Sequence, residues 1–78
     1  MDAADVRALV AEGLPDCQID VAGGGGRFEI LAVGEVFAGL SAVKRQQTVY
    51  RTLKEVIASG AVHAVTIVAR TPDEHGAA

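Results

Sequence analysis

Residues 27–33 read Arg-Phe-Glu-Ile-Leu-Ala-Val, beginning as a polar–apolar alternation and ending as an apolar run. Alternation is the pattern of a β-strand, and an apolar run is typical of a central strand that is covered on both faces. The preceding residues 18–22, Gln-Ile-Asp-Val-Ala, alternate as a strand with one solvated face does. Four glycines, Gly23–Gly26, separate the two segments, and this spacing predicts an antiparallel hairpin.

Helices are predicted on both sides of the hairpin. Apolar residues at helical spacing indicate a first helix over Ala3–Glu12. A longer helical segment, Ser41–Ser59, has an apolar stripe that is interrupted at Gln46 and Gln47. The stripe consists of Val49, Tyr50, Leu53, Val56 and Ile57. The interruption predicts two helices with a bend near Gln47–Thr48.

A third strand is predicted at Val62–Ala69, which is rich in β-branched residues and apolar on both faces, as in a well-covered strand. The element order is then α-β-β-α-α-β, an α+β fold. The helical segment before the third strand is long enough to be a crossover, so we expect a three-stranded mixed sheet with its helices on one face. In that topology the third strand starts beside the glycine loop. His63 should therefore lie near Gly23–Gly26, and Cys17 should lie at the other end of the sheet.

The composition limits the class of protein. A chain of 78 residues predicts one domain over 1–78, whose end, 73–78, we expect to be frayed. The single cysteine excludes a disulfide scaffold, and a hydrophobic content of 50% excludes a disordered chain. The acidic N-terminus is unlike a secretory signal, and no apolar stretch is long enough to cross a bilayer. We therefore expect a cytoplasmic protein without membrane contact.

Basic residues are concentrated in one part of an acidic chain. The net charge of −3 argues against a protein whose whole surface binds nucleic acid. Four of the seven basic residues nevertheless fall within eleven positions: Lys44, Arg45, Arg51 and Lys54. Such a cluster on helices suits contact with phosphates or with an acidic protein surface, although most clusters of this kind are solvated faces.

Several elements spaced along the chain resemble the signature of the BolA family. Residues 37–50 read Phe-Ala-Gly-Leu-Ser-Ala-Val-Lys-Arg-Gln-Gln-Thr-Val-Tyr. Residues 62–65, Val-His-Ala-Val, and 71–74, Thr-Pro-Asp-Glu, are similar to two further family elements. The Ala-Val-Gly-Glu at 32–35 and the Lys-Arg-Gln-Gln of the first stretch look like the IbaG-like (YrbA) bacterial branch. The resemblance implies the same fold, in the arrangement called a class II KH-like (BolA-like) domain.

The resemblance implies a partner-binding protein and not an enzyme. BolA-like proteins pair with monothiol glutaredoxins and share a [2Fe–2S] cluster, to which the glutaredoxin gives a cysteine and its bound glutathione. His63 is then the ligand from this chain, and Gly25, Gly26 and Arg27 form the loop beside the cluster. The position of Arg27 beside the glycines suggests a separate hypothesis, that it contacts a glutathione carboxylate supplied by the partner. We expect an adaptor in iron–sulfur trafficking or in iron and redox sensing, which is a monomer without cofactor alone and a heterodimer with its partner.

A second role is open. The helix-turn-helix segment 41–59 also resembles the part of the family that has been read as nucleic-acid binding, in a transcriptional regulator of the stress response. Its basic residues would hold phosphates, with Gln46, Gln47 and Thr48 available to read bases. An acidic domain with one small basic cluster is expected to bind DNA weakly and with steep salt dependence.

Two positions depart from the family pattern. Gly23–Gly26 contains no histidine or cysteine, so the second cluster ligand that the resemblance would supply is missing, and His75 replaces a tryptophan. By the residues alone, a strand-end histidine without a role is the favoured interpretation of His63, and the resemblance reverses that preference. Cys17 is better read as a small residue at a strand start than as a redox thiol. Ser41 with His63 resembles no catalytic triad.

Overall fold

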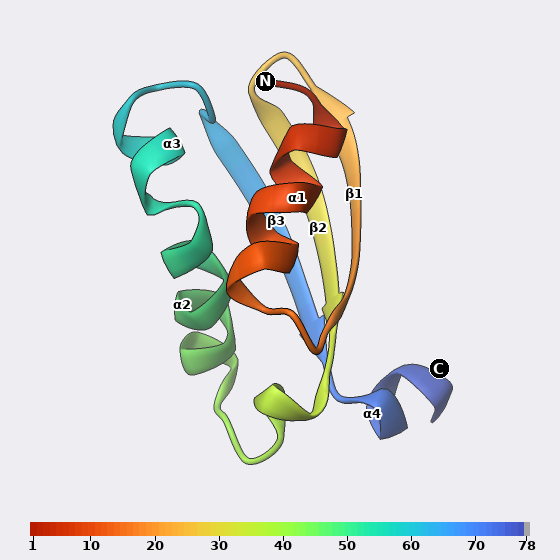
Figure 1. Ribbon diagram of the computed structural model, residues 1–78. Coiled ribbons are helices and arrows are strands. Elements are labelled where there is room, and N and C mark those ends of the chain that lie inside the picture. Colours follow the sequence, from red (N-terminus) through yellow and green to blue (C-terminus); the bar gives the residue numbers. More distant parts are fainter. Residues whose placement is uncertain (78) are drawn as a thin grey trace.

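Three strands form one mixed sheet in the computed structural model, which describes residues 1–77 (Figure 1). The strands are β1 (Gln18–Gly24), β2 (Arg27–Val33) and β3 (Ala64–Arg70). β1 pairs with β2 in antiparallel orientation and β3 pairs with β2 in parallel, so β2 is the central strand. The predicted hairpin, the mixed sheet and the central place of residues 27–33 are confirmed.

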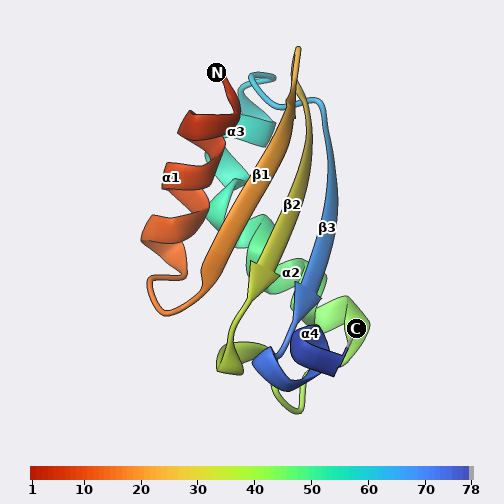
Figure 2. The same cartoon turned by 90° about the vertical axis from the view of Figure 1, so that its right-hand side faces the viewer.

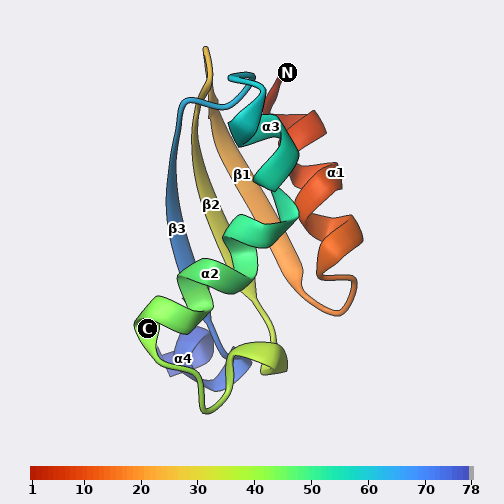
Figure 3. The ribbon, with the colours of Figure 1, turned by 90° about the vertical axis from the view of Figure 1, so that its left-hand side faces the viewer.

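Three helices cover one face of this sheet: α1 (Ala3–Gly13), α2 (Ala42–Thr52) and α3 (Lys54–Ala58). Figure 3 shows them in front of the sheet, and Figure 2 shows the opposite face without a helical layer. A short 3₁₀ helix, η1 (Glu35–Phe37), precedes α2, and α4 (Pro72–Ala77) follows β3. The predicted α+β fold with helices on one face is confirmed. No helix among residues 1–77 has both the length and the apolar character needed to span a membrane.

The core lies between the helices and one face of the sheet. Phe28, Ile30 and Ala32 alternate along β2 and are buried, whereas Glu29 between them is exposed. The largest fully buried side chains come from the helices, the sheet and the connections: Phe37, Ile30, Leu53, Val6, Val10, Val49 and Val62.

The second face of the sheet is uncovered, and the expectation that the two apolar strands are covered on both faces is wrong. Val68 of β3 is 40% exposed, and Thr66 is also exposed. A single crossover carries α2 and α3 over the same side of the sheet, so the residues of β3 that point to the other side meet solvent. β-Branched side chains suit a half-exposed pleated surface as well as a buried one, and the sequence pattern therefore does not separate the two.

The break between the crossover helices lies at Leu53, and the bend expected near Gln47–Thr48 is absent, since α2 runs unbroken to Thr52. Leu53 is fully buried and its N–H donates to the carbonyl of Tyr50, a tighter turn than that of an α-helix. The polar residue Gln46 does not interrupt the helix, because its amide Nε2 donates to the carbonyl of Ile67 on β3 at 2.7 Å. A glutamine can therefore occupy the sheet-facing side of α2, because it makes a hydrogen bond to β3 where an apolar side chain would make packing contacts.

Side chains of the helices also bond carbonyl groups on both edge strands. Arg7 of α1 donates from Nε to the carbonyl oxygen of Ile19 on β1 at 3.0 Å. Arg45 of α2 donates to the carbonyl oxygen of Ala69 on β3 at 3.2 Å, next to the bond made by Gln46. Open edges of a sheet are templates for pairing with other chains, and these contacts cover part of each edge.

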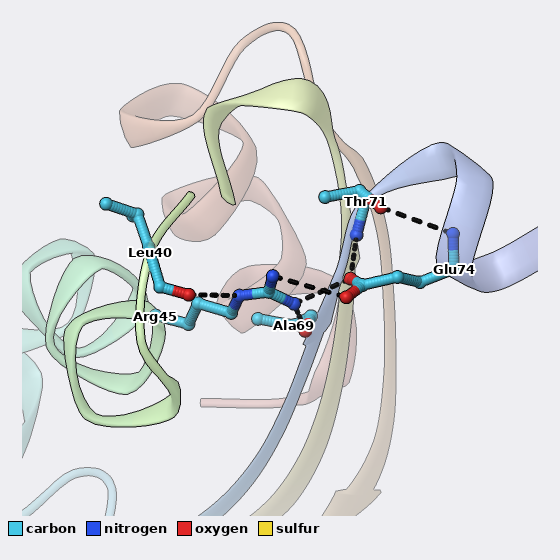
Figure 4. Close-up of polar contacts among 5 residues, drawn as sticks. All are labelled: Leu40, Arg45, Ala69, Thr71 and Glu74. Carbon is cyan, nitrogen blue, oxygen red and sulfur yellow. Dashed lines mark hydrogen bonds and ion pairs between the residues drawn. The ribbon is translucent and has the colours of Figure 1, made fainter. Parts of the chain in front are cut away.

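Arg45 holds four parts of the fold together (Figure 4). Its Nε donates to the carbonyl of Leu40 at 3.1 Å, and its guanidinium forms an ion pair with Glu74 of α4 at 2.6 Å in addition to the bond with Ala69. The Thr71 hydroxyl accepts from the Glu74 N–H, and the Glu74 carboxylate accepts from the Thr71 N–H. This reciprocal pair is a capping box for α4.

The frayed end expected over 73–78 is therefore wrong for the residues that the structure describes. Residues 73–77 continue the helix α4, and residue 78 lies outside the described chain. The capping signal, Thr71 followed three residues later by Glu74, was present in the sequence.

Glu74 is predicted to keep its ion pair far into the acid range. Hydrogen bonds from Arg45, and next from the Thr71 backbone, lower the pKa of Glu74 from 4.5 to about 2. A carboxylate with a lowered pKa stabilises the fold above its ordinary pKa, and that stabilisation is lost as the pH falls through the folded value. The NMR signals of the Glu74 side-chain carboxyl carbon and of the Thr71 N–H, which donates to that carboxylate, should therefore shift in a transition near pH 2, and Glu74→Gln should remove the transition of Thr71. A wild-type transition centred near pH 4.5 would contradict the ion pair.

Candidate ligand site and docking surface

His63 lies at the end of the sheet where the β1–β2 hairpin turns. The backbone N–H groups of His63 and Ala64 both donate to the carbonyl oxygen of Gly26, at 2.7 and 3.1 Å. Figure 1 shows the hairpin turn and the start of β3 side by side at this end. The predicted proximity of His63 to the glycine loop is confirmed, and the side chain of His63 is exposed.

The rest of the loop contributes little metal-binding chemistry. Gly25 and Gly26 have no side chains, and Arg27 is an exposed cation that pairs in register with Ala64. Within residues 1–77 there is no group of three or more His, Cys, Asp or Glu side chains that could hold a metal ion. His63 therefore offers a single imidazole at this end, which fits a shared site and not a site complete within this chain.

Cys17 lies at the opposite end of the sheet, as predicted. It precedes β1, whose first residue Gln18 pairs with Val33 at the far end of β2, and its sulfur fills the space beside Gly34. Burial, and then the neighbouring charge of Asp16, raise the pKa of the Cys17 thiol. A thiol with a raised pKa is a poor thiolate donor, and this one is far from His63.

The four clustered basic residues have different roles. Arg45 is occupied by Glu74 and by backbone carbonyls, and its side chain is only 18% exposed. Lys44, Arg51 and Lys54 are exposed. Three of the four cations are thus available on the surface of α2 and α3, whereas Arg45 serves the fold.

A shallow groove lies on α2 and α3, and two of these cations line it together with apolar side chains. Its lining consists of Gln47, Tyr50, Arg51, Lys54, Ile57 and Ala58. Tyr50 is 41% exposed. The described lining combines Tyr50, Ile57 and Ala58 with two cations and includes no carboxylate, so the groove is apolar with a positive charge beside it.

Sequence reasoning placed Tyr50 and Ile57 in the buried helical stripe and missed the groove. The spacing of seven residues puts them on one face, but Val49 and Leu53 occupy the face that is fully buried. The alternation of Tyr50 and Ile57 with Arg51 and Lys54 was the available signal for an exposed amphipathic surface.

Two further polar residues have local roles. The Ser41 hydroxyl accepts from the backbone N–H of Lys44 and caps α2. Ser41 precedes α2, whose first turn bonds Ala69 near the end of β3, whereas His63 precedes the start of β3, so the two residues lie toward opposite ends of that strand. His75 is exposed on α4.

Comparison with known proteins assigns the family. The sequence pattern of the BolA family, described as BolA-like protein, matches residues 11–74. The chain belongs to the BolA family. Among relatives, it is 43% identical to acid stress protein IbaG of Escherichia coli K12 over 74 residues, which cover 95% of this chain and 88% of that protein.

Solved structures of this family have the same fold. The chain superposes on a BolA homologue from Coxiella burnetii with a TM-score of 0.87 and 27% identity, covering 97% of both chains. The BolA domain of SufE1 from Arabidopsis thaliana superposes with a TM-score of 0.79 and 28% identity, covering 92% of this chain and 93% of that one. These similarities agree with the predicted family and with its IbaG-like branch.

Proposed function

We propose that this BolA-family chain is an adaptor that pairs with a monothiol glutaredoxin and supplies His63 to a shared [2Fe–2S] cluster. The observation that carries the proposal is the exposed imidazole of His63, held at the end of the sheet and outside any group of three or more metal-binding side chains in the described chain. A single imidazole cannot hold a cluster, so the remaining ligands come from the partner's cysteine and its glutathione.

The donor chemistry of His63 suits this role. Iron–sulfur clusters are bound mainly by thiolates, and histidine is the ligand that replaces them in some clusters and raises their reduction potential. A bound cluster would supply one-electron redox chemistry and transferable iron and sulfide. This chain would contribute the imidazole, and Arg27 would lie close enough to the loop to attract a glutathione carboxylate.

The proposed biological role is iron–sulfur trafficking or iron and redox sensing during stress, in the cytoplasm. A relative with 43% identity carries the name acid stress protein, and a BolA domain occurs within SufE1. The first name supports a part in the stress response, and the second supports association with other proteins. We propose no catalytic step for this chain.

The groove on α2 and α3 is the proposed docking surface for the glutaredoxin. Aromatic residues with neighbouring cations are enriched at the energetic centres of protein interfaces. Tyr50 with Arg51 and Lys54 has this character, and α3 leads through a short connection to His63. One partner could therefore contact the groove and the imidazole together.

Replacement of His63 is predicted to change the shared cluster. The chain and a monothiol glutaredoxin are mixed with iron, sulfide and glutathione, and visible absorption and circular dichroism are recorded. His63→Ala should change both spectra, because a ligand to iron is lost, while His75→Ala on α4 should leave them as in wild type. Identical spectra for wild type and His63→Ala would contradict the assignment of His63 as a cluster ligand.

Replacements in the groove are predicted to weaken binding of the glutaredoxin without cluster. Tyr50→Ser and Lys54→Glu should each raise the dissociation constant about tenfold in calorimetry, because buried aromatic anchors and complementary charges dominate interfaces. Val43 is 65% exposed and lies outside the groove, as does Lys44. Val43→Ser and Lys44→Glu are therefore the matched controls, and equal losses in all four variants would reject the groove.

A second candidate function is nucleic-acid binding through α2 and α3, favoured by the exposed Lys44, Arg51 and Lys54. Three phosphate contacts predict a slope of about −2.7 in a plot of log affinity against log salt. Lys44→Gln should reduce this slope by about 0.9, whereas Arg27→Gln should leave it unchanged because Arg27 is an exposed cation on β2, outside α2 and α3. Fluorescence anisotropy at several salt concentrations measures both, and a salt-independent affinity would exclude this function.

A further inference from the structure

The ring of His63 occupies the space that a side chain at Gly26 would need. A Cβ atom placed on Gly26 would fall on the Cδ2 atom of His63, inside the 3.0 Å that real Cβ contacts respect, and 3.3 Å from both Cγ and Nε2. Any residue other than glycine at this position would therefore push the imidazole away from the loop.

These distances also give the orientation of the ring. An atom above the ring face would lie at nearly the same distance from Cδ2, Cγ and Nε2. The position built on Gly26 is equally far from Cγ and Nε2 and much nearer to Cδ2, so it lies along the Cδ2–H bond in the plane of the ring. The Cδ2 edge of His63 faces Gly26, and the bond between Nδ1 and Cε1 lies on the far side of the ring.

Gly26 fixes the backbone of His63 as well as its ring. Its carbonyl oxygen accepts from the N–H groups of His63 and Ala64. Its φ of +83° lies in the left-handed region that favours glycine. One residue thus sets where the His63 main chain begins the strand and which edge of its imidazole turns outward.

We propose that Gly26 is a positioning residue for His63, which holds the Cδ2 edge of the imidazole against the loop and turns Nδ1 away from Gly26. The orientation of the His63 ring by Gly26 is argued from contacts within this chain alone. Its consequence for cluster binding rests on the proposed function. Groups that orient a metal ligand typically change metal affinity about tenfold or more when they are replaced.

Gly25 provides a matched control for the variant Gly26→Ala. It has a φ of +62°, also in the left-handed region, and a Cβ atom at Gly25 would meet nothing in the described chain within 4 Å. Gly25→Ala and Gly26→Ala therefore introduce similar backbone strain in neighbouring positions, but only Gly26→Ala collides with the His63 ring.

NMR of the wild-type protein without metal tests the contact between Gly26 and the Cδ2 edge of the His63 ring directly; this contact is called the seat of His63. NMR should show a nuclear Overhauser effect from the Gly26 Hα atoms to the Hδ2 atom of His63 that is stronger than the effect to its Hε1 atom. In Gly26→Ala the Hδ2 and Hε1 shifts of His63 should change, and in Gly25→Ala they should stay close to wild type. A stronger effect to Hε1, no effect to the ring, or equal shift changes in the two variants would overturn the seat.

The second measurement is the affinity of each variant for the glutaredoxin that carries the cluster. Gly26→Ala should lose about tenfold or more. The control for affinity is Gly39→Ala, which lies outside the loop, has a φ of +76° and would place its Cβ within 4 Å of nothing in the described chain, so it should stay near wild type. If Gly26→Ala does not fold, the wild-type Overhauser effect still decides the geometry. A confirmed seat with equal cluster spectra in wild type, Gly26→Ala and His63→Ala would overturn the proposed function and the positioning role that rests on it. If the wild-type protein lacks the Overhauser effect between Gly26 and Hδ2 of His63, but His63→Ala changes the cluster spectrum, the positioning role alone would be overturned.

Discussion

The carbonyl oxygen of Gly26 is the point on which the arrangement of this molecule depends. By accepting the N–H groups of both His63 and Ala64, it starts the parallel pairing in which Arg27 lies opposite Ala64. A parallel pair requires a crossover, and the crossover carries α2 and α3 over one face of the sheet. The same bond brings a histidine from late in the chain to the hairpin turn, while the cysteine stays at the far end.

The opposite end of the sheet is held by Arg45, and this changes the meaning of the basic cluster. A guanidinium that bonds the carbonyls of Leu40 and Ala69 and the carboxylate of Glu74 joins α2, β3 and α4. Of the cations that remain, Arg51 and Lys54 line an apolar groove and Lys44 lies outside it. That surface favours a protein partner with apolar and acidic groups over a polyanion, in keeping with an acidic chain.

The order of elements, the mixed sheet and the place of His63 could be predicted from sequence, because strand patterns and a long crossover leave few topologies. The contacts of Gln46 with Ile67 and of Arg45 with Glu74 could not, because they join residues 21 and 29 positions apart. Because their partners lie so far away in the sequence, the position of Gln46 was interpreted as a bend in the helix and Arg45 as a cation available to a ligand. The helical C-terminal segment was predictable from its capping residues. The seat of His63 on Gly26 depends on side-chain geometry that no spacing reveals.

The central claim is that His63 of this chain binds the iron of a cluster shared with a glutaredoxin. The most direct measurement is pulsed electron paramagnetic resonance of the reduced complex, with ¹⁵N-histidine in this chain only and with His75→Asn to leave one labelled imidazole. Ligation by His63 predicts a ¹⁵N hyperfine coupling of the size given by a nitrogen bound directly to iron. A reduced cluster signal without such a coupling would contradict it.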